Sequence, residues 1–152
     1  MYFINKIKEK YNNQNIVIFV DMDGVITDYD FSNKLDFKNK RCIMTNINTL
    51  KEISKLENVL LCILSVCRKD FEIKIKNDWL DKNAPFFKFE NRIILSKENN
   101  NLSSKELKCN FLNNYNRKNN KIIVIDDDNE ILKYLSKNVK DIDLYQDSSI
   151  ID

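Results

Sequence analysis

The chain has 152 residues and a formal net charge of +2, with 43% hydrophobic and 32% charged residues. This length suits one domain with a single sizeable core, and the composition is typical of a globular protein that works in water. The longest apolar runs, residues 16–20 and 59–66, are far too short to cross a bilayer, and the N-terminus lacks the apolar segment of a signal peptide. We therefore expect a cytoplasmic protein with no membrane partner.

Four cysteines and the absence of histidine restrict the chemistry that the chain can perform. None of the cysteines forms a Cys-x-x-Cys pair, so a zinc site is not expected, and their thiols should be reduced. Without histidine, Ser-His and Cys-His catalysis is excluded. Acid–base chemistry must then come from carboxylates, Lys, Tyr or Cys.

The first half of the chain alternates between helix and strand patterns. Residues 2–11 carry apolar side chains at helical spacing and predict a short amphipathic helix. Residues 16–20 are a continuous β-branched and aromatic run, which is typical of a buried strand. After an irregular stretch over 24–44, the pattern predicts a helix over 46–57 and a second buried strand over 59–64.

The second half continues the same alternation. A helix is predicted over about 70–83, with Pro85 just past its end, and Ser103 or Ser104 is a suitable N-cap for a later helix. The remaining predicted elements are a strand over 92–95, the capped helix through about 115, a strand over 122–125, a helix around 131–135 and a strand over 142–145.

Strands that alternate with helices indicate βαβ units. We expect a single domain over 1–152 with a three-layer, Rossmann-like α/β fold. Its mostly parallel sheet should have about five strands, with a short cap or flap insertion over about 24–44 after the first strand. In such sheets ligands bind outside the carboxyl ends of the strands. Polar residues stand there, because Asp21 follows the first strand, Ser65 the second and Asp126 the fourth.

The run Asp21-Met22-Asp23-Gly24-Val25 is the most informative motif. Two carboxylates at a strand end repel each other unless a cation joins them, and Mg²⁺ is a suitable partner for carboxylates and phosphate oxygens. Gly24 is the only glycine of the chain, which indicates a turn with positive φ or a close approach of a ligand. The alternative is an Asp-rich turn that caps the next helix. An EF-hand is excluded because its loop glycine stands at the sixth position.

A second acidic cluster, Asp126-Asp127-Asp128, follows the fourth strand. It can meet the first cluster across the edge of the sheet, or Asp128 or Asn129 can simply cap the next helix, and both functions are compatible. Ser65 offers a hydroxyl for a phosphoryl oxygen, although it can equally be a buried serine.

A lysine on the helix after residue 103 is a further candidate. Lys108 comes shortly before Phe111 and Leu112, which define the apolar face of this helix, and it can be an ordinary surface lysine. Lys105 competes with it for any special role.

Taken together, these residues resemble the haloacid dehalogenase-like (HAD) phosphohydrolase superfamily. Its pattern is an Asp-x-Asp-Gly strand end, a strand ending in Ser or Thr, a helical Lys and a strand ending in paired acidic residues. The matching segments occur in this order over residues 16–135: Asp21-Met22-Asp23-Gly24-Val25, Ile63-Leu64-Ser65, Lys108-Cys109-Asn110-Phe111-Leu112 and Ile125-Asp126-Asp127.

The resemblance implies a Mg²⁺-dependent phosphatase that works through an aspartyl-phosphate. By this likeness Asp21 is the nucleophile and Asp23 the acid–base residue, while Ser65 and Lys108 bind phosphoryl oxygens. The metal ligands would be Asp21, the backbone carbonyl of Asp23, and Asp126.

Five further residues receive supporting roles in this interpretation. Asp127 would be a partner of Lys108 or of the metal, and Gly24 would allow the close approach of a ligand. Arg68, Tyr29 and Phe31 are candidates for contacts with the substrate.

The closest likeness within the superfamily is to the small 5′(3′)-deoxyribonucleotidase-type branch. The runs Asp21 to Tyr29 and Lys76-Asn77-Asp78-Trp79-Leu80 are similar to that branch. The insertion here is much shorter than the cap of those enzymes. Ser65-Val66-Cys67-Arg68 is also similar to the Ser-Gly-Arg of polynucleotide 3′-phosphatases, without its glycine. The resemblance thus implies a small phosphorylated substrate such as a nucleotide, with a nucleic-acid 3′ end or another small phosphate as alternatives.

Two other classes of protein share parts of this pattern. A receiver-type phospho-acceptor domain uses aspartates, a Ser or Thr and a Lys, but its acidic pair comes early in the chain and its acceptor in the middle. A non-catalytic binding module on the same fold would lack at least one of the chemical positions, and all of them are present here.

Overall fold

The computed structural model describes residues 2–28 and 37–150, in which helices and strands alternate along the chain. The predictions for Tyr29 and Phe31 lie outside the described residues. The helices and strands are α1 (Tyr2–Lys10), β1 (Ile16–Val20), α2 (Met44–Ile53), β2 (Val59–Cys67), α3 (Phe71–Asn83), β3 (Arg92–Ser96), α4 (Ser104–Asn114), β4 (Lys121–Asp126), α5 (Asn129–Asn138) and β5 (Ile142–Gln146). Short 3₁₀ turns are η1 (Phe37–Asn39), η2 (Phe89–Asn91) and η3 (Asp147–Ile150).

The five strands form one sheet in the order β3-β2-β1-β4-β5, and every neighbouring pair is parallel. The predicted Rossmann-like α/β fold with about five strands is therefore confirmed. Several boundaries differ from the predictions, for example in α2, which begins and ends earlier than the predicted 46–57, and one of them matters for the site. Strand β2 continues past Ser65 to Cys67, because residues 65–67 pair with residues 94–96 of β3. Ser65 consequently lies inside the strand rather than at its end.

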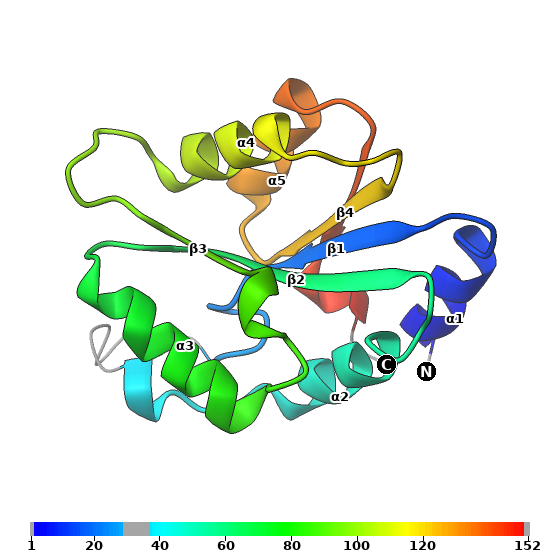
Figure 1. Cartoon of the computed structure of the whole chain (residues 1–152), viewed down its shortest axis with the longest axis horizontal. Coiled ribbons are helices and arrows are strands. Elements are labelled where there is room, and N and C mark those ends of the chain that lie inside the picture. Colours follow the sequence, from blue (N-terminus) through cyan, green and yellow to red (C-terminus); the bar gives the residue numbers. More distant parts are fainter. Residues whose placement is uncertain (1, 29–36, 151–152) are drawn as a thin grey trace.

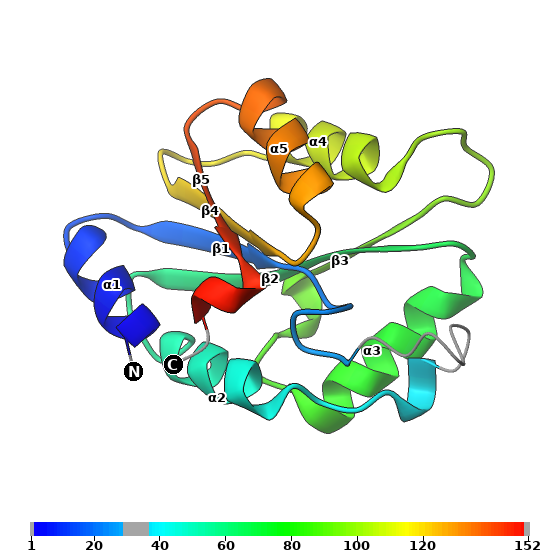
Figure 2. The same cartoon turned by 180° about the vertical axis from the view of Figure 1, so that it is seen from behind.

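Helices cover both faces of the sheet and complete three layers. Helices α1, α2 and α3 lie on one side, and α4 and α5 lie on the other (Figures 1 and 2). Every residue of strand β1 is apolar because its side chains point alternately into two different hydrophobic cores, one on each face of the sheet. Ile16, Ile18 and Val20 belong to the core shared with α1, α2 and α3, whereas Val17 and Phe19 belong to the core under α4 and α5.

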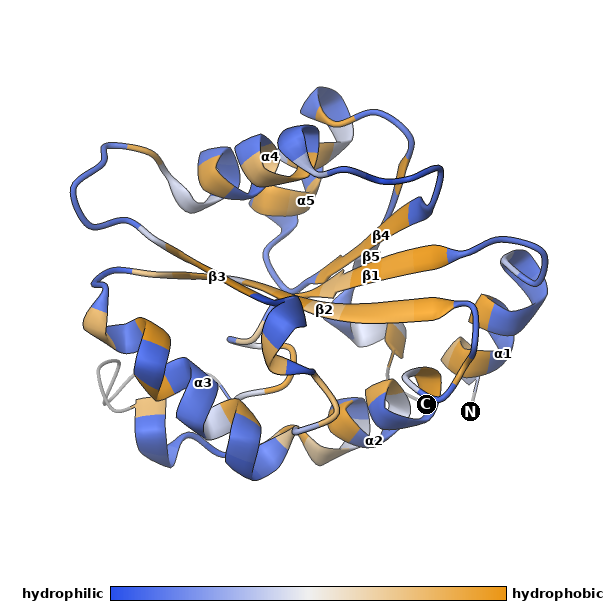
Figure 3. Cartoon of the chain, in the orientation of Figure 1, coloured by the Kyte–Doolittle hydropathy of each residue, from blue (hydrophilic) through white to orange (hydrophobic). Residues whose placement is uncertain are grey.

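The hydropathy of each element follows this layering. Figure 3 shows hydrophobic strands in the middle and helices whose outer faces are hydrophilic. Helix α4 begins with a capping box. The Ser103 hydroxyl accepts from the backbone N–H of Glu106, and the Glu106 carboxylate accepts from the backbone N–H of Ser103. This resolves the N-cap in favour of Ser103. None of the described helices is long and apolar enough to span a membrane.

The chain after β1 makes a tight turn that sets the position of the motif residues. The backbone N–H groups of Val25, Ile26 and Thr27 all donate to the carbonyl of Met22, at 3.0–3.2 Å. Residues 41–43 then run back beside residues 26–28, through bonds from Asp28 to Arg41 and from Ile43 to Ile26. Part of the predicted insertion over 24–44 lies outside the described residues, so its extent stays a prediction.

Candidate active site

Three carboxylates from two adjacent strands meet at the carboxyl edge of the sheet. The backbone N–H of Asp21 donates to the Ile125 carbonyl, which places the end of β1 next to the end of β4. Asp21, Asp126 and Asp127 each offer an oxygen, and these atoms lie within 4.8 Å of one another. Asp21 and Asp126 are only 9% and 1% exposed. A set of hard oxygen donors of this kind fits Mg²⁺ or a similar divalent cation.

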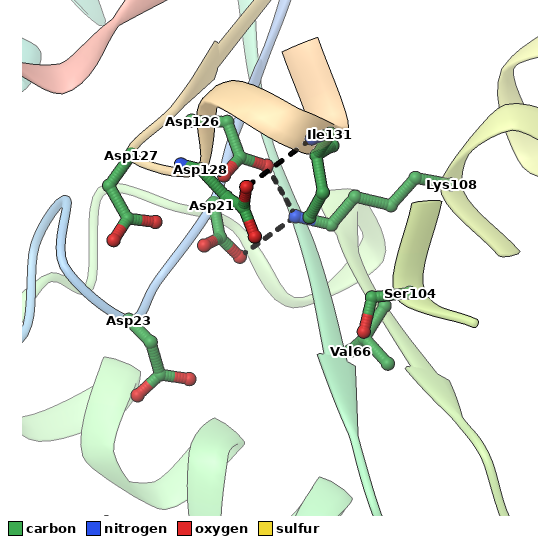
Figure 4. A pocket seen from close by; sticks show the side chains of 9 residues that line it. All are labelled: Asp21, Asp23, Val66, Ser104, Lys108, Asp126, Asp127, Asp128 and Ile131. Atoms are coloured by element: carbon green, nitrogen blue, oxygen red, sulfur yellow. Dashed lines mark hydrogen bonds and ion pairs between the residues drawn. The ribbon is translucent and has the colours of Figure 1, made fainter. Parts of the chain in front are cut away.

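Lys108 bridges two of these carboxylates from the opposite side. Its Nζ donates to Asp126 Oδ2 at 2.6 Å and lies 3.1 Å from Asp21 Oδ1, and the side chain is 3% exposed (Figure 4). The competing Lys105 lies one turn earlier on α4 and pairs with Glu130 of α5 instead. The structure thus brings Lys108 into the acidic cluster and leaves Lys105 outside it.

Burial and like charges change the protonation of this cluster. Burial, opposed by Lys108 and assisted by the charge of Asp126, raises the pKa of Asp21 to about 7. Burial and the Asp126 charge also raise the pKa of Asp127 to about 6. Burial disfavours the charged Lys108, but the two carboxylates outweigh this effect, so its pKa lies above its ordinary value. Without a cation, protons therefore compete for Asp21 near neutral pH and for Asp127 at mildly acidic pH, and a bound metal would displace them.

Asp23 faces a different pair of lysines. Its Oδ2 accepts from Lys76 Nζ of α3 at 3.2 Å, and its Oδ1 accepts from Lys40, just after η1. Burial alone would raise the pKa of Asp23, but Lys76 and Lys40 overcome this effect and lower it. Asp23 is therefore ionised at neutral pH in this structure, and it stands apart from Lys108 across the pocket (Figure 4).

Ser65 and Arg68, the candidates on β2 and just after it, lie in different surroundings. Ser65 is fully buried, and its hydroxyl is bonded to Lys76 Nζ at 2.8 Å. It does not line the pocket beside the acidic cluster, whereas its neighbour Val66 does. Arg68 is exposed in the turn before α3, where its backbone N–H donates to Glu72.

The acidic cluster opens into a pocket of about 530 Å³, a volume that suits a small ligand or one end of a larger one. Figure 4 shows the side chains that surround it. They are Asp21, Asp23, Val66, Ser104, Lys108, Asp126, Asp127, Asp128 and Ile131. Asp128 is also the N-cap of α5, since its carboxylate accepts from the backbone N–H groups of Glu130 and Ile131. The acidic triplet thus both caps a helix and lines the pocket, as the sequence allowed.

Gly24 is needed because Asp127 occupies the space next to it. Its φ is +78°, a backbone conformation that residues with a side chain rarely adopt. A Cβ at this position would lie 2.2 Å from Asp127 Oδ2 and 2.5 Å from Asp127 Cγ. The single glycine therefore lets the loop after β1 pack against the second acidic cluster.

The sequence patterns gave no role in the site to three polar residues that line the pocket or bond to Asp23. Lys76 carried a recoverable signal, because it shares the buried face of α3 with Trp79 and Leu80, three and four positions later. Ser104 lies four residues before Lys108 on α4, so helical spacing puts both toward the pocket. Lys40 follows an irregular stretch, where no periodic pattern could have indicated it.

Comparison with known proteins supports the fold. Neither a protein-family model nor a curated protein matches the sequence. One solved structure, described as "Structure of Pnkp1/Rnl/Hen1 complex", contains a similar chain with a TM-score of 0.68 and 13% identity over 88% of this chain. A second, "Structure of the Pnkp1/Rnl/Hen1 RNA repair complex", has a TM-score of 0.68 and 12% identity over 88%. This chain spans 46% and 42% of those chains, so the likeness covers less than half of each.

Proposed function

We propose that the protein is a Mg²⁺-dependent phosphomonoester hydrolase of the HAD type, with Asp21 as the nucleophile. One observation carries the proposal. The carboxylates of Asp21, Asp126 and Asp127 converge at the carboxyl edge of a parallel sheet, and the buried ammonium of Lys108 joins two of them. An anionic nucleophile, a cation site and a fixed positive charge beside an open pocket are the parts that phosphoryl transfer needs.

In the first step a carboxylate oxygen of Asp21 attacks phosphorus, and the bond from phosphorus to the leaving oxygen breaks. Asp23 supplies a proton to this oxygen as its negative charge develops. The product alcohol leaves, and an aspartyl-phosphate remains on Asp21. Lys108, already 3.1 Å from Asp21 Oδ1, is placed to stabilise negative charge on the phosphoryl oxygens.

In the second step water attacks phosphorus while Asp23 takes a proton from it. The bond from phosphorus to Asp21 breaks, which regenerates the carboxylate and releases inorganic phosphate. Lys40 and Lys76 keep Asp23 ionised, the state that a base needs. Protonation for the first step is favoured when a phosphate dianion approaches, because its charge raises the pKa of a neighbouring carboxylic acid.

The metal that the proposal requires fits the donors that are present. Asp21, Asp126 and Asp127 would hold Mg²⁺, with the backbone carbonyl of Asp23 as a further ligand. A bound Mg²⁺ screens the repulsion between the carboxylates and an anionic substrate and stabilises charge on phosphoryl oxygens. In this proposal Asp127 is a direct ligand, whereas the resemblance implied only a partner of Lys108 or of the metal.

Three substrate classes are candidates for the pocket: free nucleoside monophosphates, nucleic-acid ends that carry a phosphate, and other small phosphate esters. Similarity to chains from an RNA repair complex favours the second class. The exposed Arg68, next to the end of β2, offers a guanidinium for a backbone phosphate. We therefore propose a nucleic-acid phosphate end as a second candidate substrate beside the nucleotide.

The test is a panel of phosphomonoesters assayed for release of inorganic phosphate, with Mg²⁺ and with EDTA. The panel holds p-nitrophenyl phosphate, nucleoside 5′- and 3′-monophosphates, and oligonucleotides with a 3′- or 5′-phosphate. We expect Mg²⁺-dependent release from at least one of them. Release from none would favour a binding module, and a stable phosphoprotein without release would favour a phospho-acceptor domain.

A further inference from the structure

Lys76 is buried at a position where a helix surface meets the end of the sheet. It lies on α3 and is 2% exposed, whereas Lys74 two residues earlier is exposed and pairs with Asp78. Lysines are almost never fully buried unless their ammonium group is paired, since a buried unpaired charge is strongly unfavourable. The surroundings of Lys76 must therefore supply compensating partners.

Those partners are three acceptors, two of them within β2 and one in the turn after β1. Lys76 Nζ donates to Ser65 Oγ at 2.8 Å, to the Val66 carbonyl at 3.1 Å and to Asp23 Oδ2 at 3.2 Å. An ammonium group has three N–H donors and no acceptor, so its capacity is used completely. Lys76 is not among the residues that line the pocket. It is thus placed to hold other residues rather than to bind the substrate.

The direction of these bonds determines what Ser65 can do. Because Lys76 can only donate, Ser65 Oγ accepts from it, and the Ser65 hydrogen is left for another acceptor. Within residues 2–28 and 37–150, the Ser65 hydroxyl makes no second hydrogen bond. Lys76 therefore orients the hydroxyl so that its hydrogen can point away from α3.

Asp23 is fixed by the same ammonium group. Lys76 holds Oδ2 while Lys40 holds Oδ1, so neither oxygen can rotate without the loss of an ion pair. The Lys76 and Lys40 ammonium groups both lie over the Phe37 ring, with Lys76 Nζ 4.9 Å from its centroid. One lysine of the core and one lysine of the inserted segment thus determine how the Asp23 carboxylate is presented.

From this geometry we infer that Lys76 is a positioning residue that orients Ser65 and Asp23 together. The inference rests on the proposed phosphatase function. It gives a role to a residue outside the four superfamily motifs, which belongs to the run Lys76-Asn77-Asp78-Trp79-Leu80. It predicts a specific kinetic pattern. A misplaced Asp23 transfers its proton poorly, and this matters more for an alkyl phosphate, whose leaving group needs a proton, than for p-nitrophenyl phosphate, whose leaving group does not.

The experiment compares Lys76→Met with the control Lys74→Met, which lies on the same helix but on its exposed side. Steady-state kinetics are measured with p-nitrophenyl phosphate and with whichever alkyl phosphate of the panel the wild type hydrolyses best. We expect Lys76→Met to lower kcat by about 10²-fold on the alkyl phosphate and by about tenfold or less on p-nitrophenyl phosphate, with KM little changed. Lys74→Met should match the wild type on both.

Two further variants keep the inference testable. If Lys76→Met does not fold, Lys76→Arg keeps the charge but cannot direct three donors from one nitrogen, and it should show the same selective loss. In the double variant Lys76→Met/Ser65→Ala, the fold-loss of kcat should be clearly smaller than the product of the two single losses. Both substitutions disrupt the same hydrogen bond between Lys76 and Ser65, so their effects are not independent.

Equal losses of kcat on both substrates, or a Lys76→Met variant as active as Lys74→Met, would overturn the inference about Lys76 and leave the proposed function standing. A wild-type protein that is inactive on the whole panel would instead overturn the proposed function, and the inference with it.

Discussion

Substitution of Gly24 by alanine tests whether the glycine turn and Asp127 are packed as the structure shows. Two separate effects are expected. The φ of +78° is unfavourable for a residue with a Cβ and should lower the free energy of unfolding by about 1–2 kcal/mol. In addition, the new Cβ would lie 2.2 Å from Asp127 Oδ2, far inside van der Waals contact, so the Asp127 carboxylate must move.

A double-mutant cycle separates these effects. In the Asp127→Ala background the Oδ2 and Cγ atoms are gone, and the nearest remaining Asp127 atom is its Cβ at 3.1 Å. Gly24→Ala should then cost the backbone strain of about 1–2 kcal/mol and a small adjustment for the 3.1 Å approach of the two Cβ atoms, and the coupling between the two positions should reach at least about 0.5 kcal/mol. Urea unfolding of the four proteins measures it. Equal costs of Gly24→Ala in both backgrounds would refute this reasoning.

The same variant also has a functional consequence. Displacement of the Asp127 carboxylate removes one of the three oxygens of the acidic cluster, so Mg²⁺ affinity should fall about tenfold or more. Isothermal titration with Mg²⁺ measures this loss without any substrate. A Gly24→Ala protein with wild-type Mg²⁺ affinity would show that Asp127 is not a metal ligand.

The remaining predictions concern charge at the same site. Because the pKa values of Asp21 and Asp127 are raised to about 7 and about 6, protons compete with the metal, and Mg²⁺ affinity from titrations between pH 5 and 8 should rise with pH. A pH-independent affinity would contradict these shifts. In metal-free protein the raised pKa of Asp21 contributes stability that is complete below about pH 4 and is lost as pH rises to about 7. The melting temperature of Asp21→Asn should therefore depend less on pH across this window than that of the wild type. Lys108→Met leaves Asp21 and Asp126 facing each other without a counter-charge. It should lower the free energy of unfolding in urea by about 3–5 kcal/mol, with partial recovery in Mg²⁺, whereas an unchanged value would show that the bridge contributes nothing.

Much of the fold could be predicted because its signals are local. The β-branched run over residues 16–20 is apolar at every position, which only a strand buried on both faces requires. The N-cap of α4 could be predicted to be Ser103 or Ser104 and that of α5 to be Asp128 or Asn129, and the structure selects Ser103 and Asp128, whose short side chains accept from nearby backbone N–H groups. The end of β2 could not be predicted, because its extension to Cys67 depends on pairing with β3, about 30 residues further along.

The candidate site could be predicted where strand ends determine it. Asp21 and Asp126 come together because parallel strands present their carboxyl ends at one edge of the sheet. The lysines could not be assigned in the same way. Whether Lys105 or Lys108 enters the site depends on the rotation of α4 against the sheet, and the position of Lys40 depends on how the inserted segment folds back. These are tertiary relations that no short pattern contains.

The central claim, that Asp21 attacks phosphorus, is tested most directly by Asp21→Asn. The substitution keeps the shape of the side chain but removes the anionic nucleophile, and circular dichroism checks that the fold is retained. Phosphate release is measured with Mg²⁺ on the best substrate of the panel. We predict that wild-type protein releases phosphate and that Asp21→Asn releases none above the background without enzyme. Appreciable turnover by a folded Asp21→Asn protein would contradict the assignment of Asp21 as the nucleophile.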